Sequence, residues 1–531
     1  MFGFQSTVKS EVVQSRIGLP PSNRCGKLES MKYISTRGTS APLSSKKAII
    51  KGIADDNGLY VPSAFPFLGF DPFGHLSQPS YALRAINILR PFLTDFEERE
   101  LQHDCQIAYG SNFDSPSTAP VRFLDEATAV LELWHGPTLA FKDMALQLMP
   151  HLITTAIRSE GGAHEVVILV ATSGDTGKAA LEGFANVEGV RIFVFYPHDG
   201  VSEMQRLQMV TQRGKNVGVC GVIGNFDDAQ TGVKQIFSKR DINETLEGSR
   251  FRLSSANSIN WGRLAPQIAY YFTVYEEMVL AGKVKRGDEI NLCVPTGNFG
   301  NILAAYYATR CGLPVSKLIC ASNINKVLTD FIRTGVYDRR REFHKTESPS
   351  MDILISSNLE RLIFELAGRN PEQVSKWMNQ LTEEGIYRIP GSALDELRSL
   401  FYGGYADRDE TSKAIRDAFE KLGYLLDPHS AVGFHVLQKY REETGDSKPA
   451  ALASTASPFK FNRGVLEALG RETSGRDEFS LLRELSSMSG QPVPQRLAEL
   501  QSLPETHRGV CTTQDMAKVL FKFLNINPTG L

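Results

Sequence analysis

The chain has 531 residues, of which 42% are hydrophobic and 22% are charged, and its formal net charge is −2. This composition is ordinary for a globular protein and excludes a disordered chain, while the near-zero charge argues against a nucleic-acid binder held by bulk positive charge. No run approaches the roughly 18 apolar residues that a membrane-spanning helix needs, so we expect no membrane partner. At roughly 100–200 residues per domain, the length predicts two to four domains.

The two chain features that report on compartment are the cysteines and the first thirty residues. The seven cysteines are scattered without a CxxC pair, so no metal is expected and a reducing, cytoplasmic setting is favoured. Residues 1–30 carry Ser, Lys and Arg with Glu11 and Glu29, and they lack the apolar core of a secretory signal. We interpret them as a disordered or mis-started extension ahead of Met31, with an organelle transit peptide as the alternative.

Regular elements are predicted from Met31 onward. The pattern predicts a helix over Lys46–Asp55, a short strand at Leu59–Val61 and a helix over Thr94–Gly110. Thr94 and Glu97 have the spacing of a capping box, and Gly110 suits a helix stop.

Three units of strand, glycine loop and helix follow between about 120 and 325. The predicted strands are Thr128–Trp134, Val166–Ala171 and Asn291–Val294, and the predicted helices are Asp143–Arg158, Lys178–Asn186 and one that ends at Arg310. Because continuous apolar strands alternate with helices, we predict an α/β protein with parallel sheets covered on both faces. The tail after about 465 is predicted to be a docked helical extension, with helices at Glu478–Ser489 and Gln514–Leu524.

Lys142 is the first candidate for chemistry. It directly follows Ala140 and Phe141, at the point where a loop becomes a predicted helix. A lysine among apolar neighbours is partly desolvated, which lowers its pKa and supplies neutral amine for Schiff-base chemistry. The alternative is a lysine whose stem lies along an apolar surface while its ammonium group stays in water.

Two glycine-rich loops, Ala171–Gly177 and Pro295–Asn301, each join a predicted strand to a predicted helix. Glycines expose backbone N–H groups and the helix directs its positive end at the loop, so each loop suits a carboxylate or a phosphate. An ordinary strand–helix turn is the alternative, and Asp175 partly opposes an anion at the first loop. The second loop lacks the Walker A lysine and the G-x-G-x-x-G spacing, which disfavours an NTPase or a dehydrogenase.

Two further polar segments could contribute to a site. Ser254–Arg263 ends in an arginine, a residue type that binds phosphate in a forked geometry. The alternative is that the segment is only a polar loop before a helix. Ala453–Pro458 offers hydroxyls that either hydrogen-bond a ring nitrogen or cap a turn. A Schiff-base lysine combined with two or three anion loops points to a phosphorylated aldehyde cofactor and a substrate with a carboxylate, and pyridoxal phosphate fits that description.

These motifs together closely resemble those of the threonine synthase family. The resemblance is carried by His135–Asp143, the two glycine loops and Ser454–Phe461, with Tyr33–Gly38 and Gly58–Pro62 near the start, and it covers about residues 31–530. It implies the fold-type II architecture of pyridoxal-phosphate enzymes, similar to the tryptophan synthase beta chain. The implied parts are an extension at 1–30, an N-terminal domain at 31–120, a large cofactor-binding domain from 121–150 and 251–465, a small domain at 151–250, and a C-terminal helical extension at 466–531.

The resemblance also implies residue roles. Lys142 would bond covalently to the cofactor and act as the catalytic base, and Thr455 would face the pyridine nitrogen. The cofactor phosphate would lie on Gly297, Asn298, Phe299, Gly300 and Asn301. The substrate carboxylate would lie on Ser173, Gly174, Asp175, Thr176 and Gly177, with the role of the Asp175 side chain left open. Candidates for the substrate phosphate are Asn257, Asn260 and Arg263.

The implied activity is that of a lyase converting O-phospho-L-homoserine and water to L-threonine and phosphate by γ-elimination and β-addition. One alternative is a phospho-lyase that yields 2-oxobutyrate and phosphate from the same motifs. Others are a dehydratase of free threonine and a non-catalytic binding relative that keeps the fold. The sequence leaves a monomer and a homodimer equally open.

Overall fold

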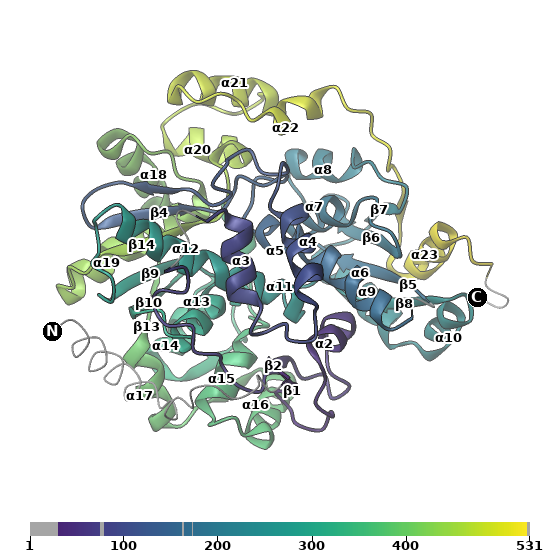
Figure 1. Cartoon of the computed structure of the whole chain (residues 1–531). Helices are drawn as coiled ribbons and strands as arrows, with labels where there is room; N and C mark the ends of the chain where they lie inside the picture. The colour runs from purple at the N-terminus through teal and green to yellow at the C-terminus, as the bar shows by residue number, and fades with distance from the viewer. Residues whose placement is uncertain (1–29, 75–78, 162–163, 173, 528–531) are drawn as a thin grey trace.

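Two parallel-rich sheets lie side by side in the computed structural model, which describes residues 30–74, 79–161, 164–172 and 174–527 (Figure 1). The larger sheet has the strand order β13-β10-β9-β14-β4-β3, and only β3 runs antiparallel to its neighbour. Its strands are β3 (Val121–Phe123), β4 (Thr128–Glu132), β9 (Ile290–Pro295), β10 (Val315–Ser322), β13 (Phe401–Tyr405) and β14 (Ala450–Ser454). The predicted α/β fold with parallel-rich sheets is confirmed.

The smaller sheet is parallel throughout, with the order β15-β7-β6-β5-β8. Its strands are β5 (Glu165–Ala171), β6 (Val190–Pro197), β7 (Val217–Val222), β8 (Phe251–Ser254) and β15 (Val510–Cys511). Both β8 and β15 lie outside the range 151–250 expected for this unit.

Alternate residues of the central strands enter different cores, as strands buried on both faces require. In β4, Ala129 and Leu131 join one apolar cluster while Val130 joins another. In β5, Ile168 and Leu169 likewise join two different clusters.

The helices around the sheets are α2 (Ser45–Lys51), α3 (Tyr81–Leu89), α4 (Glu98–Ala108), α8 (Glu203–Val210), α9 (Phe226–Ser238), α10 (Arg240–Gly248), α11 (Trp261–Leu264), α12 (Pro266–Leu280), α13 (Gly300–Arg310), α14 (Val327–Thr334), α15 (Leu359–Leu366), α16 (Pro371–Glu383), α17 (Gly391–Leu400), α18 (Arg408–Leu422) and α19 (Pro428–Thr444). None of the helices in the described ranges is long and apolar enough to cross a membrane.

The N-terminal segment confirms the predicted strand and corrects both helices. A two-stranded antiparallel sheet forms from β1 (Tyr33–Ser35) and β2 (Tyr60–Pro62). Helix α2 ends at Lys51 because Gly52 takes a left-handed cap with φ of 74°. Helix α4 begins only at Glu98: its capping box is formed by Glu97 and Glu100, since the Thr94 hydroxyl accepts a hydrogen bond from the Met31 N–H at 2.8 Å.

The helix predicted over Asp143–Arg158 is divided into α5 (Asp143–Leu146) and α6 (Met149–Ser159). Pro150 has no N–H and cannot bond to the Leu146 carbonyl. That carbonyl instead packs against Gly183 of α7 (Asp175–Phe184), where a Cβ would lie 2.0 Å from it. Helix α7 starts earlier than the predicted Lys178, so Asp175 belongs to its first turn.

The C-terminal segment connects the two sheets. Helices α20 (Asn462–Ala468) and α21 (Glu478–Ser489) pack with the larger sheet's helices, and the predicted bounds of α21 are confirmed. The chain then passes α22 (Gln495–Ala498) and adds β15 to the smaller sheet, before α23 (Met516–Leu524) packs with α9 (Figure 1). The tail is therefore a helical extension that also contributes a strand.

Candidate active site

Lys142 lies after β4, at the end of a tight turn that folds back onto Asp143. The Asp143 carboxylate accepts hydrogen bonds from the Thr138 N–H at 2.8 Å and the Thr138 hydroxyl at 2.7 Å. Gly136 packs so closely that a Cβ there would lie 2.5 Å from the Cβ of Asp143. Leu139 takes a left-handed backbone conformation with φ of 59°, the kind of local strain found where a side chain must be aimed. The turn leaves the Lys142 side chain 9% exposed.

A second segment is laid antiparallel to this turn. The Phe141 N–H donates to the Thr455 carbonyl at 2.8 Å, and the Ser457 N–H donates to the Leu139 carbonyl at 3.1 Å. This pairing brings Thr455 beside Lys142. Thr455 is buried, and its hydroxyl makes no hydrogen bond to any described residue.

The Asp175 carboxylate lies between two buried lysines. Its Oδ2 is 3.5 Å from the Lys142 Nζ, and its Oδ1 is 2.7 Å from the Nζ of Lys460. Gln205 donates to Oδ1 at 3.2 Å, and Lys142 donates to the Ser350 hydroxyl at 3.0 Å. Asp175 thus contacts Lys142 directly, which gives its side chain a place in the site.

Burial and two neighbouring positive charges shift Lys142 toward its neutral form, and the Asp175 carboxylate opposes that shift. Burial lowers the pKa of Lys142 to about 8, opposed by Asp175 and helped by the positive charges of Lys460 and Arg263. Burial alone would raise the pKa of Asp175, but the charges of Lys460 and Lys142 hold that pKa well below its usual range. A buried amine poised near neutrality beside a fixed carboxylate can act as a nucleophile and as a base.

The second glycine loop forms a cradle at the start of α13. Phe299 caps the helix with a left-handed φ of 62°. A Cβ on Gly297 would lie 2.2 Å from the Ser350 carbonyl oxygen, and the Asn298 carbonyl accepts hydrogen bonds from the N–H and side chain of Asn358 at 3.2 and 2.9 Å. The loop is thus held in one shape by the segment around 350–358.

Asn301, in the first turn of α13, has an unused donor. Its Oδ1 accepts hydrogen bonds from the hydroxyls of Tyr270 and Tyr271, each at 2.5 Å, while its Nδ2 is buried and has no partner among the described residues. A buried amide donor without a partner is costly, and here it follows Gly300 at a helix N-terminus. The cradle therefore has the donors and the dipole that a phosphate requires.

The first glycine loop uses part of its backbone internally. Ser173 lies outside the described residues. The N–H groups of Gly174 and Gly177 both donate to the Thr172 hydroxyl, at 3.1 and 2.9 Å, so they are not free for a carboxylate. Gly174 has φ of 144°, and a Cβ there would lie 2.5 Å from the Gln205 side chain. Thr176 follows Asp175 in the first turn of α7 and is half-buried.

The three residues expected to bind a substrate phosphate have different surroundings. Asn260 is fully buried and caps α11, and its amide donates to the Ile49 and Ser255 carbonyls, so we do not retain it as a ligand. Arg263 is buried and donates to the Ala256 carbonyl at 2.8 Å. Asn257 is half-buried, and its side chain makes no hydrogen bond to any described residue.

Sequence reasoning missed Lys460, Ser350 and His429. Lys460 lies inside the run Ser454–Phe461 that carried the family resemblance, so a signal for it existed. The Nδ1–H of His429 donates to the Asp427 carboxylate at 2.8 Å, and its Nε2 accepts from the Ser350 N–H at 3.2 Å. No sequence motif identified Ser350 as a site residue, because it lies in an irregular segment far along the chain from Lys142.

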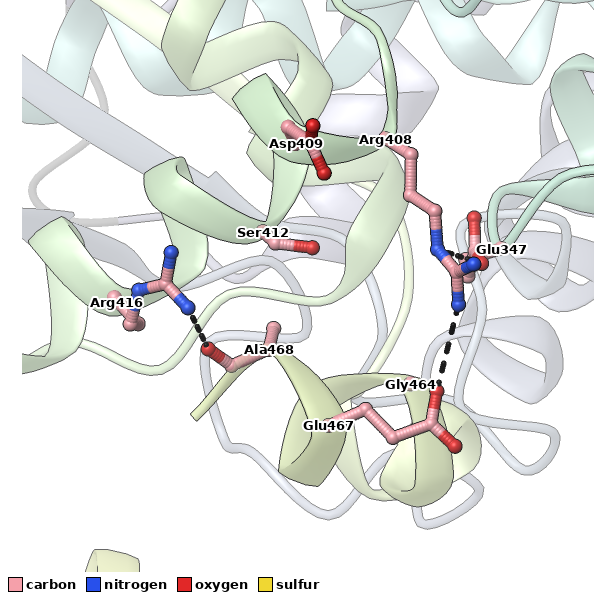
Figure 2. Close-up of a pocket in the computed structure, with 8 residues that line it drawn as sticks. All are labelled: Glu347, Arg408, Asp409, Ser412, Arg416, Gly464, Glu467 and Ala468. Carbon is pink, nitrogen blue, oxygen red and sulfur yellow. Dashed lines mark hydrogen bonds and ion pairs between the residues drawn. The ribbon is translucent and has the colours of Figure 1, made fainter. Parts of the chain in front are cut away.

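A pocket of about 290 Å³ lies elsewhere, beside α18 and α20, and contains none of the residues around Lys142 (Figure 2). Figure 2 shows Arg408 directed at Glu347 and Glu467, and Arg416 bonded to the Ala468 carbonyl. Arg408 thus forms ion pairs with both glutamates of this pocket. In the described part of the chain no group of three or more His, Cys, Asp and Glu side chains is placed to hold a metal ion.

Comparison with known proteins agrees with this geometry. The family described as pyridoxal-phosphate dependent enzyme matches residues 126–455, threonine synthase N terminus matches 32–109, and threonine synthase, C-terminal, matches 430–519. The chain is 39% identical to a threonine synthase of Pseudomonas aeruginosa, over 82% of this chain and 90% of that protein. It is also 39% identical to human threonine synthase-like 1, over 84% of this chain, but spans only 61% of that relative's length.

A solved structure gives the same result. The crystal structure of threonine synthase from Brucella melitensis with pyridoxal phosphate bound is 36% identical, with a TM-score of 0.82, and covers 93% of this chain and 99% of that one. The fold and site thus define a fold-type II pyridoxal-phosphate-dependent enzyme. Within that class, the chain belongs to the threonine synthase family.

Proposed function

We propose that this enzyme is a threonine synthase, which converts O-phospho-L-homoserine and water to L-threonine and phosphate. The observation that carries the proposal is the buried Lys142 amine, with its pKa near 8, which Ser350 links to the helix-capping cradle at Gly297–Asn301. The match to threonine synthases of similar length supports the same activity.

The described residues fit pyridoxal phosphate. Lys142 would bond to its aldehyde, the cradle with the unpaired Asn301 Nδ2 would hold its phosphate, and the unpartnered Thr455 hydroxyl would face its ring nitrogen. Gly297 leaves no room for a side chain because the Ser350 carbonyl packs against it, which fixes the backbone of the cradle. When bound, the cofactor supplies an electron sink for the charge that develops on the substrate carbons.

Protein groups then supply the proton transfers. Lys142, once free of the cofactor, would take protons from Cα and Cβ, and it would return one to Cγ after phosphate leaves. A pKa near 8 suits both directions of transfer at neutral pH. Arg263 is buried and cationic, and it would hold the leaving phosphate with Asn257. Water then adds its hydroxyl at Cβ, and the second proton returns to Cα, which completes L-threonine.

The test is to incubate the purified protein with O-phospho-L-homoserine and to measure threonine, 2-oxobutyrate and phosphate in one sample. Threonine equal to phosphate is the expected result. Phosphate matched by 2-oxobutyrate would replace the proposal with a phospho-lyase. Absence of phosphate release would favour a non-catalytic relative, and activity on free threonine would indicate a dehydratase.

Replacing Arg263 by alanine is expected to raise the KM for O-phospho-L-homoserine by about 10- to 100-fold, since hydrogen bonds to a charged group contribute about 1.5–3 kcal/mol. Cofactor content should stay close to that of the unmodified protein. Arg408→Ala is the matched control, because Arg408 is 70% exposed and lies in the separate surface pocket. If Arg263→Ala mainly lost bound cofactor, the assignment of Arg263 to the substrate phosphate would be wrong.

A further inference from the structure

Asp175 is shared unequally between the two lysines that it contacts. The Lys460 Nζ is 2.7 Å from one carboxylate oxygen, whereas the Lys142 Nζ is 3.5 Å from the other. The side chains of Asp175 and Lys460 are 3% and 0% exposed, so solvent does not screen this pair. The closer, fully buried ion pair is therefore the one that does not involve Lys142.

Lys460 is fixed in place by its own surroundings. It lies in the 3-10 turn Pro458–Phe461, directly after the segment that pairs antiparallel with the turn before Lys142. Its Nζ also donates to the Thr138 carbonyl at 3.0 Å. Asp175, by contrast, comes from α7 on the smaller sheet, so this ion pair joins the two sheets across the site.

We propose that Lys460 is a positioning residue, which holds the Asp175 carboxylate back from a tight ion pair with Lys142 and thereby increases the neutral, nucleophilic fraction of the Lys142 amine. The inference rests on one part of the proposed function, namely that Lys142 reacts with the cofactor aldehyde. It assigns a role to Lys460 and to the Asp175 side chain, which the sequence alone did not give a role.

The direction of each effect follows from the charges that face Lys142. These are Asp175 on α7, Lys460 after β14 and Arg263 on α11, with His429 on α19 facing Asp175. Without the Lys460 charge, Asp175 has Lys142 as its nearest cation, and their pairing stabilises the protonated amine. Without the Asp175 charge, Lys142 faces only positive groups, which destabilises the protonated amine.

The experiment follows the rate at which Lys142 bonds to added pyridoxal phosphate, with loss of water, in full-length protein freed of bound cofactor. The rate is measured by absorbance across a pH series that brackets 8. Borohydride reduction and mass spectrometry then locate the bond on Lys142. Because only the neutral amine adds to the aldehyde, the midpoint of the rate profile reports protonation of Lys142 without any turnover.

Lys460→Met should move that midpoint upward by about one pH unit, which makes bond formation about tenfold slower well below the midpoint. Lys460→Arg keeps the charge and should restore the original midpoint. Asp175→Asn should move the midpoint downward. An unchanged midpoint in Lys460→Met would overturn the inference.

Two further outcomes separate the possible failures. If circular dichroism shows that Lys460→Met does not fold, Asp175→Asn decides: a fall of the midpoint supports the inference, and no fall overturns it. If the unmodified chain bonds to the cofactor but forms no threonine, the proposed function fails while the inference is still tested by these shifts. If Lys142 forms no bond with pyridoxal phosphate at any pH, both are overturned.

Discussion

Replacing Lys142 by alanine is expected to abolish the covalent link to pyridoxal phosphate and to lower turnover of O-phospho-L-homoserine by about 10³-fold or more, since a positioned base alone contributes up to about 10⁴-fold. The loss of both the nucleophile and the base at once explains the size of the effect. Absorbance of the bound cofactor reports the first effect, and phosphate release reports the second.

Lys413→Ala is the matched control for this variant. The Lys413 side chain is 68% exposed on α18 and pairs with Asp417 at the surface. It should retain cofactor and turnover. Steady-state rates near normal in Lys142→Ala would end the proposed mechanism, because no other described lysine lies in the turn before α5.

Gly297→Ala is expected to weaken binding of pyridoxal phosphate by about 5- to 150-fold, because an inserted methyl group in a packed site costs about 1–3 kcal/mol. The added Cβ would lie 2.2 Å from the Ser350 carbonyl oxygen, so the cradle and the 350–358 segment must separate. Equilibrium titration of the cofactor measures the change in affinity.

The control for this variant is Gly391→Ala, at the start of α17, where a Cβ meets no atom within 4 Å. It should bind the cofactor as the unmodified protein does. Equal affinities in Gly297→Ala and Gly391→Ala would show that the cradle tolerates a shift of its backbone and that phosphate binding does not depend on this close approach.

Local patterns were sufficient for much of the fold and for part of the site. The apolar runs of β5 and β9 predicted strands buried on both faces, and they pack in that way. The turn before Lys142 and the cradle Gly297–Asn301 were also recognisable, because each is a short contiguous motif whose glycines and neighbouring helix are visible in a few residues. Their roles toward cofactor and substrate stay predictions.

Helix boundaries failed where a distant contact replaced the local one. Thr94 had the spacing of a capping residue, but its hydroxyl bonds to Met31, and Glu97 takes the cap. The helix predicted through Asp143–Arg158 is interrupted because Leu146 packs its carbonyl against Gly183 of another helix. In both cases the competing partner lies more than thirty residues away, where local spacing carries no information.

The sequence by itself determined the α/β class, the lysine that stands out and the two glycine loops, because residues within a few positions of one another set strand periodicity, turns and helix starts. Only the tertiary structure decided that Asp175 lies between Lys142 and Lys460, that Ser350 packs against Gly297 of the cradle, and that β15 joins the smaller sheet. The Asp175 contacts join the two sheets, and the other two contacts join segments that lie far apart along the chain. Each depends on how distant segments pack together, a property of the whole buried core rather than of any one segment.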